Sequence, residues 1–325
     1  MQAILIYFAA VITGFVTLIW GADRFVLGAA AFARNLGVST MLIGLTIVGF
    51  GTSAPEVLVG AMASLQGNAG LAVGNAIGSN IANIALVLGA TALVAPLAVS
   101  SQTVRQEIPI LLLITLATLG LLLNGELSRL DGAIMLTGLA ALLGWMVHLG
   151  LSHTPEDNLL ADYDAEIRSD LSLNASMAWT AVGLLVLLTG AQALVWGGSG
   201  LAEAIGVSDT VIGVTVVAIG TSLPELAVSV AGARKREHDL VLGNIMGSNM
   251  FNLLAVLGIA SAIGPIDLDP TILAFHFPSM VVLTLALFAM SYDLRGGPGR
   301  INRIEGAMLL TAFASYHYMV YRSAL

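Results

Sequence analysis

GLTIVGFGTSAPE at residues 44–56 and GVTVVAIGTSLPE at residues 213–225 are two versions of one pattern. A second pattern accompanies it, since GNAIGSNIANIALVLG at residues 74–89 returns as GNIMGSNMFNLLAVLG at residues 243–258. Both pairs are separated by the same shift of 169 residues (213 − 44 and 243 − 74). A constant shift across two blocks indicates a duplicated structural unit.

The chain is too apolar for a soluble protein. Of its 325 residues, 57% are hydrophobic and 10% charged, with a mean hydropathy of +0.93, whereas soluble domains are about 25% charged. Apolar stretches of about 20 residues, enough to cross a hydrocarbon core of about 30 Å, recur along it. We therefore predict an all-α polytopic membrane protein with ten spans, near residues 3–33, 41–65, 70–94, 107–123, 131–150, 177–205, 210–233, 239–263, 271–291 and 304–321. The chain has no Cys, which excludes disulfides and thiolate metal sites.

The duplicated unit holds five of these spans, and five is an odd number. The second copy therefore enters the membrane from the opposite side, so the two repeats are inverted about a pseudo-two-fold axis in the membrane plane. This arrangement is typical of transporters, because rocking the same structure exposes one site alternately to either side. We expect a first repeat at 1–150, an acidic cytoplasmic linker at 151–176 and a second repeat at 177–325.

Basic residues predict the orientation, because Lys and Arg concentrate on cytoplasmic loops. With the N-terminus outside, the inside loops hold most of them, including Arg34, Arg105 and the basic run 234–236, whereas the outside segments hold only Arg129 and Arg322. We therefore expect a plasma (inner) membrane protein with both termini on the extracytoplasmic side. The N-terminal stretch lacks the basic region of a signal peptide, so we expect it to be a retained first span.

The GTSxPE pattern lies near the middle of spans 2 and 7. Pro55 has no N–H and clashes with the preceding turn, and Gly51 is a weak helix former, so the helix is predicted to be broken there. Gly220 and Pro224 predict the same break in span 7. Broken backbone at membrane depth is tolerated only where it lines a cavity or is buried in protein, and its freed carbonyls can bind cations.

Each pattern ends in a glutamate, Glu56 or Glu225. An ionised carboxylate at the bilayer centre costs at least about 2.5 kcal/mol, and no Lys or Arg lies at comparable depth in spans 2, 3, 7 or 8. A bound cation can supply the missing countercharge, because two carboxylates neutralise one Ca²⁺, which takes about six to eight oxygen ligands. One face of span 3 and the equivalent face of span 8 offer further oxygens at i, i+4 and i+8: Asn75, Ser79, Asn83, Asn244, Ser248 and Asn252.

Other interpretations of these residues stay open. The spacing Ser53-x-x-Glu56 is also that of a capping box, in which each glutamate would only cap its half-helix. Asn80 and Asn249 point about 100° from the serine face, so they serve either helix–helix hydrogen bonding or ligation. A passive cation channel is a competing function, since inverted repeats with broken helices also occur in channels. No Walker A, G-x-S-x-G or H-E-x-x-H motif is present, so we expect neither an enzyme nor a cofactor.

At these motifs the chain resembles the calcium/cation antiporter superfamily, whose repeats carry GTSxPE followed by GNxxGSN. It is most similar to the prokaryotic sodium/calcium exchanger-like membrane proteins, over essentially the whole chain. The resemblance implies a ten-helix exchanger fold, with spans 2, 3, 7 and 8 as the transport core and spans 1 and 6 sliding against it. It also implies that Glu56 and Glu225 bind Ca²⁺. Six hydroxyl side chains would complete the calcium and sodium sites: Thr52, Ser53, Ser79, Thr221, Ser222 and Ser248.

One position departs from part of the family. Many prokaryotic and potassium-dependent members have Asp where this chain has Asn252, and the equivalent residue of the first repeat is Asn83. Both asparagines are candidate oxygen ligands, but the site then has two carboxylates and not three, which argues against potassium coupling. The expected function is exchange of Ca²⁺ for Na⁺ by alternating access, with Ca²⁺/H⁺ antiport as the alternative. The expected partners are these ions and the lipid bilayer, not nucleic acid, and a monomer is sufficient.

Overall fold

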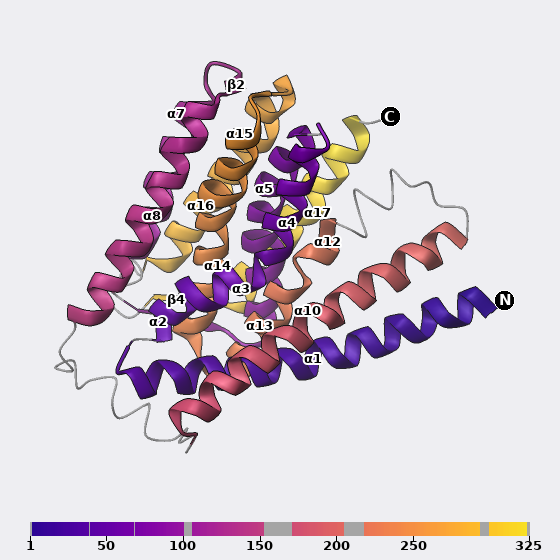
Figure 1. Cartoon of the computed structure of the whole chain (residues 1–325), viewed down its shortest axis with the longest axis vertical. Coiled ribbons are helices and arrows are strands. Elements are labelled where there is room, and N and C mark those ends of the chain that lie inside the picture. Colours follow the sequence, from indigo (N-terminus) through magenta and orange to yellow (C-terminus); the bar gives the residue numbers. More distant parts are fainter. Residues whose placement is uncertain are drawn as a thin grey trace.

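The computed structural model describes residues 2–38, 40–67, 69–100, 106–152, 171–204, 218–292 and 299–323. Over these residues the chain is mostly helical (Figure 1), and helices occupy each of the ten apolar segments expected from the sequence. The α-helices are α1 (Gln2–Leu36), α2 (Thr40–Ile43), α3 (Gly49–Thr52), α4 (Ala54–Leu65), α5 (Ala69–Ala82), α6 (Gly89–Val94), α7 (Ile108–Leu122), α8 (Arg129–Ser152), α10 (Leu173–Ala204), α12 (Ala218–Thr221), α13 (Leu223–Arg234), α14 (His238–Phe251), α15 (Leu257–Ile263), α16 (Phe277–Ser291) and α17 (Arg303–Ser323). Wider, π-helical turns join some of them: η1 (Gly44–Val48), η2 (Asn83–Leu88), η5 (Asn252–Val256) and η6 (Ile272–His276).

By length and composition, six helices of the described part are able to cross a membrane, or seven if one bent pair counts as a single span. The bent pair is Met41–Thr52 with Ala54–Leu65, whose axes differ by 45°. The helix Ile108–Leu122 is apolar but shorter. The acidic segment 153–170, expected to form a cytoplasmic linker, lies outside the described residues, between the end of α8 and the start of α10.

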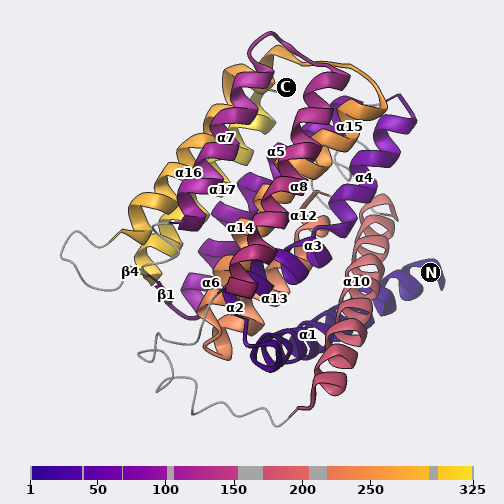
Figure 2. The ribbon, with the colours of Figure 1, turned by 60° about the vertical axis from the view of Figure 1, so that its left-hand side comes forward.

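The long helices α1 and α10 lie side by side along one flank of the molecule, apart from the bundle formed by the other helices (Figures 1 and 2). Glycines recur every seven residues on both helices, at positions related by the 169-residue shift: Gly14, Gly21 and Gly28 on α1 and Gly183, Gly190 and Gly197 on α10. A Cβ atom at Gly21 would lie 2.5 Å from the backbone nitrogen of Leu187, and one at Gly190 would lie 2.6 Å from that of Leu18. Moving toward the C-terminus of α1, the contacts move toward the N-terminus of α10, so the helices are antiparallel. We call this line of backbone contacts the glycine seam; it lets the two helices pack as one unit.

The helical line 238–263, formed by α14, η5 and α15, is the centre of the bundle. Its most apolar window is completely buried within the protein. Close approach of α14 to the first repeat depends on glycine, since a Cβ at Gly243 would lie 2.6 Å from the Met41 carbonyl oxygen, and one at Gly44 would lie 2.6 Å from the Leu240 carbonyl oxygen. The segment that leads into the first GTSxPE pattern is therefore held directly against the backbone of α14.

Short strands, which the sequence analysis did not predict, join the two repeats. β1 (Leu97–Val99) pairs antiparallel with β4 (Gly299–Ile301), and β2 (Glu126–Leu127) pairs antiparallel with β3 (Ile266–Asp267). Strands of two or three residues are too short to show an alternating pattern, which is why the sequence gave no signal for them. β1 and β3 begin 169 residues apart, so the strand pairs follow the same internal shift as the motifs.

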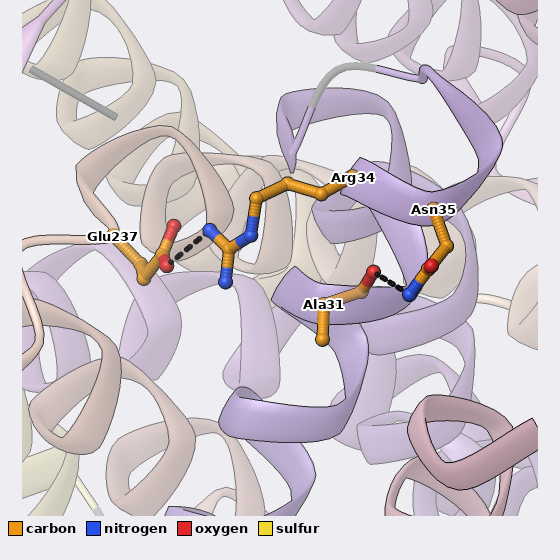
Figure 3. A network of polar contacts seen from close by, with 4 residues as sticks. All are labelled: Ala31, Arg34, Asn35 and Glu237. Atoms are coloured by element: carbon orange, nitrogen blue, oxygen red, sulfur yellow. Dashed lines mark hydrogen bonds and ion pairs between the residues drawn. The ribbon is translucent and has the colours of Figure 1, made fainter. Parts of the chain in front are cut away.

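Two ion pairs connect α1 to the turn between α13 and α14. Arg34 Nη1 lies 3.1 Å from Glu237 Oε1 (Figure 3), and Lys235 Nζ lies 2.6 Å from Asp23 Oδ1. One turn before the first pair, the Asn35 side-chain amide donates to the Ala31 carbonyl at 2.8 Å. Partly exposed pairs of this kind contribute at most about 1 kcal/mol. Their main effect is geometric, because they hold α1 against the start of α14.

Candidate cation site

Two helix breaks at equivalent positions form the base of the site. The chain leaves helical geometry at Ser53, between α3 and α4 (φ −84°, ψ 4°), and at Ser222, between α12 and α13 (φ −86°, ψ 2°). In each case a proline follows in the first turn of the second half-helix, where its missing N–H is tolerated. Since Pro55 and Pro224 cannot donate, the carbonyls four residues earlier lose their helical donors. The predicted breaks in spans 2 and 7 are therefore present.

Glu56 and Glu225 lie one residue beyond these prolines, and both are almost completely buried, at 1% exposure each. Neither takes part in an ion pair within the described part of the chain. One oxygen of each carboxylate, Oε2, has no hydrogen-bond donor among the described residues. Two negative charges are thus withdrawn from water without a protein countercharge, which is costly unless a cation accompanies them.

Hydroxyl groups reach each glutamate from the opposite repeat. Ser53 donates to Glu225 Oε1 at 3.1 Å, and Thr221 hydrogen-bonds to the Glu56 carboxylate. Ser248, on α14, donates to the same Glu225 oxygen at 3.4 Å. The two broken helices therefore meet through their functional side chains, so that each carboxylate is held partly by the other half of the molecule.

Thr52 links the first break to α14. Its hydroxyl donates to Asn244 Oδ1 at 3.0 Å and lies 3.4 Å from Ser248 Oγ. On the other side of the site, the Asn75 amide donates to the Glu56 carbonyl at 3.3 Å. Asn75 and Asn244 were placed on the correct helix faces by the i, i+4, i+8 spacing, and the structure shows that both contact a GTSxPE segment.

Asn83 and Asn252 stand at the first positions of η2 and η5, where the helix widens. Both side chains are buried, and their amide nitrogens donate to Asn249 Oδ1 at 3.1 Å and to Asn80 Oδ1 at 3.0 Å. Asn80 and Asn249 therefore make helix–helix hydrogen bonds, which decides the alternative that the sequence left open for them. π-helical turns are frequent at functional sites, because they redirect side chains within an otherwise regular helix.

The capping interpretation of the Ser-x-x-Glu spacing is wrong. Neither Ser53 nor Ser222 makes a side-chain cap hydrogen bond. The backbone N–H of Ser53, which a capping-box glutamate would accept from, donates to the Gly49 carbonyl at 3.1 Å. The hydroxyl of Ser53 is directed across the interface between repeats, and this could not be read from local spacing.

The chemistry of the cluster suits a hard cation. Its side-chain donors toward an ion are carboxylate, hydroxyl and amide oxygens, the ligands that Ca²⁺ and Na⁺ accept. Over the described residues, no group of three or more His, Cys, Asp or Glu could hold a metal ion. Ser79, at 5% exposure, lies one turn before Asn83 on α5, in the position that Ser248 has on α14. The arrangement provides two charges and many neutral oxygens.

The two break serines predict a difference in stability that can be measured. Ser222 Oγ is buried without a partner among the described residues, whereas the Ser53 hydroxyl bonds to a carboxylate. In ion-free detergent, Ser53→Ala is expected to cost about 1.5–3 kcal/mol, as for a lost hydrogen bond to a charged group, and Ser222→Ala close to none. Thermal unfolding of the two variants side by side tests this. Equal losses of melting temperature would contradict the hydrogen-bond assignment.

Comparisons with known proteins agree along the whole chain. A family model described as sodium/calcium exchanger protein matches residues 6–147 and 175–322. CaxA of Alkalimonas amylolytica is 49% identical over 313 residues, which cover 96% of this chain and 98% of CaxA. The sodium/calcium exchanger MaX1 of Methanosarcina acetivorans is 30% identical, with 96% of this chain and 98% of that protein covered. A solved structure of the sodium-calcium exchanger NCX_Mj, soaked with Na⁺ and Sr²⁺, matches with a TM-score of 0.84 at 32% identity, covering 98% of each chain.

Proposed function

Because the chain belongs to the sodium/calcium exchanger protein family, and is thus a membrane cation antiporter and not an enzyme, we propose that it exchanges Ca²⁺ for Na⁺, with Ca²⁺ held between Glu56 and Glu225. One observation carries this assignment. Both carboxylates are buried without an ion-pair partner in the described chain, and both accept hydrogen bonds from the opposite repeat. One divalent cation supplies the countercharge for both.

Alternating access accounts for how a site this buried loads and releases ions. We propose ten spans in two inverted repeats, with the α1–α10 pair sliding along the core that contains the broken helices. The equivalent breaks at Ser53 and Ser222 and the reciprocal contacts between the repeats support this arrangement. In this orientation the basic turn of Lys235 lies on the cytoplasmic side and both termini on the extracytoplasmic side.

Sodium is favoured as the counter-ion by the hydroxyl and amide oxygens around the two glutamates and by the names of MaX1 and NCX_Mj, both sodium/calcium exchangers. Ca²⁺/H⁺ antiport is the second candidate, since a carboxylate can also carry a proton. The amide at Asn252 leaves only two such groups in the cluster. A passive channel fits less well, because the paired carboxylates are at 1% exposure and a conducting pore is continuous.

Ion flux in everted vesicles tests the proposal. We expect Ca²⁺ uptake when Na⁺ is loaded inside and diluted outside, and no uptake when the two sodium concentrations are equal. Addition of a protonophore in sodium-free buffer distinguishes the counter-ion. Uptake that ignores the sodium gradient and stops when the pH gradient collapses would replace Na⁺ by H⁺, and single-channel currents in a planar bilayer would revive the channel.

A further inference from the structure

Four asparagines form a reciprocal network at the centre of the molecule. Asn83 Nδ2 donates to Asn249 Oδ1, and Asn252 Nδ2 donates to Asn80 Oδ1. Under the 169-residue shift, Asn80 corresponds to Asn249 and Asn83 to Asn252, so the two bonds exchange with each other. All four side chains are buried. The bonds cross between α5 with η2 of the first repeat and α14 with η5 of the second.

The orientation of one amide in this network is fixed by groups that only accept hydrogen bonds. Asn80 Nδ2 donates to the backbone carbonyl of Asn249 at 3.2 Å and contacts Met280 Sδ at 3.5 Å. Neither partner can donate, so the nitrogen of the Asn80 amide must face them and its oxygen must point the other way. That oxygen meets Asn252, which has to present its own nitrogen.

The consequence appears on the far side of the Asn252 amide. With the nitrogen engaged by Asn80, the oxygen Oδ1 of Asn252 is buried and has no donor among the described residues. Asn252 follows Ser248 by one helical turn on the same face, and Ser248 Oγ lies 3.4 Å from Glu225 Oε1. The free oxygen therefore belongs to the cation site, one turn along from the carboxylate.

We propose that Asn80 is a positioning residue that turns the Asn252 amide so that oxygen, and not nitrogen, faces the transported cation. The inference rests on the proposed function, and it assigns a role to a residue outside the set of expected ligands. An amide offers one oxygen and one NH₂ group, and a flipped amide would direct N–H dipoles at a positive ion. An aspartate at this position would present oxygen in either orientation. The Asn80 contact is thus required because residue 252 is an asparagine, in keeping with the way outer hydrogen bonds orient metal ligands.

The other half of the network lacks this anchor. Asn249 Nδ2 has no partner among the described residues, so no acceptor fixes the Asn249 amide as the Asn249 carbonyl and Met280 fix that of Asn80. The orientation of Asn83 is correspondingly less determined. This difference between the repeats places the firmly oriented amide oxygen in the second repeat, beside Glu225.

A double-mutant cycle between residues 80 and 252 tests the inference in proteoliposomes with sodium-driven ⁴⁵Ca²⁺ uptake. Asn80→Leu keeps the side-chain volume and removes both the donor and the acceptor, and Asn80→Ala serves as a second variant if the first does not fold. We expect Asn80→Leu to raise the KM for Ca²⁺ about tenfold, equivalent to about 1.4 kcal/mol, with the maximal rate within about twofold. In the Asn252→Asp background, the same change is expected to alter KM by less than about twofold. Asn174→Leu, at an exposed position of α10, is the matched control and should leave KM unchanged.

The outcomes separate this inference from the proposed function. A tenfold rise in KM in both backgrounds would show a general packing role for Asn80 and overturn the inference, as would an unchanged KM in the Asn252 background. Calcium uptake by the unmodified protein, measured in the same vesicles, reports on the proposed function. Its absence would remove the exchange function and, with it, the role of Asn80.

Discussion

Replacing either mid-membrane glutamate by glutamine, in Glu56→Gln or Glu225→Gln, is expected to reduce Ca²⁺ exchange by at least about 100-fold. With one carboxylate left, a bound Ca²⁺ would carry an uncompensated positive charge in a site withdrawn from water. Removing one partner from a buried charge assembly costs about 3–5 kcal/mol, and about 2.8 kcal/mol already corresponds to a factor of 100. Initial rates of sodium-driven Ca²⁺ uptake, normalised to the reconstituted protein, measure the effect.

Glu126→Gln is the matched control for this experiment. Glu126 lies in the short strand β2 and its side chain is exposed, so the same loss of one charge should leave the uptake rate unchanged. A rate above about one tenth of the unmodified value in either Glu56→Gln or Glu225→Gln would argue that a single carboxylate is enough. The two-carboxylate site proposed for Ca²⁺ would then be wrong.

Gly21→Leu is expected to prevent assembly of the folded protein, because it would place a large side chain within the glycine seam. Even a single Cβ at Gly21 would lie 2.5 Å from Leu187 N and 2.8 Å from Leu187 Cα, and backbone atoms cannot move aside without separating α1 from α10. The milder Gly21→Ala should therefore lower the free energy of unfolding by about 1–3 kcal/mol, the usual cost of overpacking. Thermal unfolding in detergent and the yield of monodisperse protein are the measurements.

A glycine elsewhere in the helices provides the comparison. Gly144 in α8 has no heavy atom of the described chain within 4 Å of an added Cβ. Gly144→Ala should be neutral or stabilising by up to about 1 kcal/mol, since alanine is the better helix former. If Gly21→Ala and Gly144→Ala shift the melting temperature equally, the seam does not depend on backbone contact.

Local chemistry was sufficient to predict the helix breaks and the positions of the two glutamates. Pro55 and Pro224 remove a backbone donor wherever they stand in a helix, so the break follows from the residue itself. The internal shift of 169 residues likewise placed the equivalent residues Ser53 and Ser222 together in the argument. The glycine seam was also present in the sequence, as a seven-residue spacing related by that shift, and the sequence analysis did not use it.

Other parts of the site depend on contacts between distant segments. The hydroxyl of Ser53 could have capped its own half-helix, and only the packing of the two repeats directs it to Glu225. Similarly, nothing in the spacing of Asn80 and Asn252 tells which end of each amide faces the other, because this orientation depends on the Asn249 carbonyl and Met280. The short strand pairs join segments about two hundred and about one hundred and forty residues apart (301 − 97 and 267 − 126) and have no local signature.

The antiparallel course of α1 and α10 has an electrical consequence. Each helix has a macrodipole equivalent to about half a positive charge at its N-terminus and half a negative charge at its C-terminus. The N-terminal part of α1 lies against the C-terminal part of α10, since a Cβ at Gly197 would lie 2.7 Å from the Tyr7 carbonyl oxygen, so these partial charges cancel in pairs. Moving half a charge across a potential of 100 mV would require about 1.1 kcal/mol, whereas the paired helices move almost no net dipole charge. In the proposed cycle, the voltage dependence of exchange therefore reports the ions and the ionised side chains that move with them, and not the helices that slide.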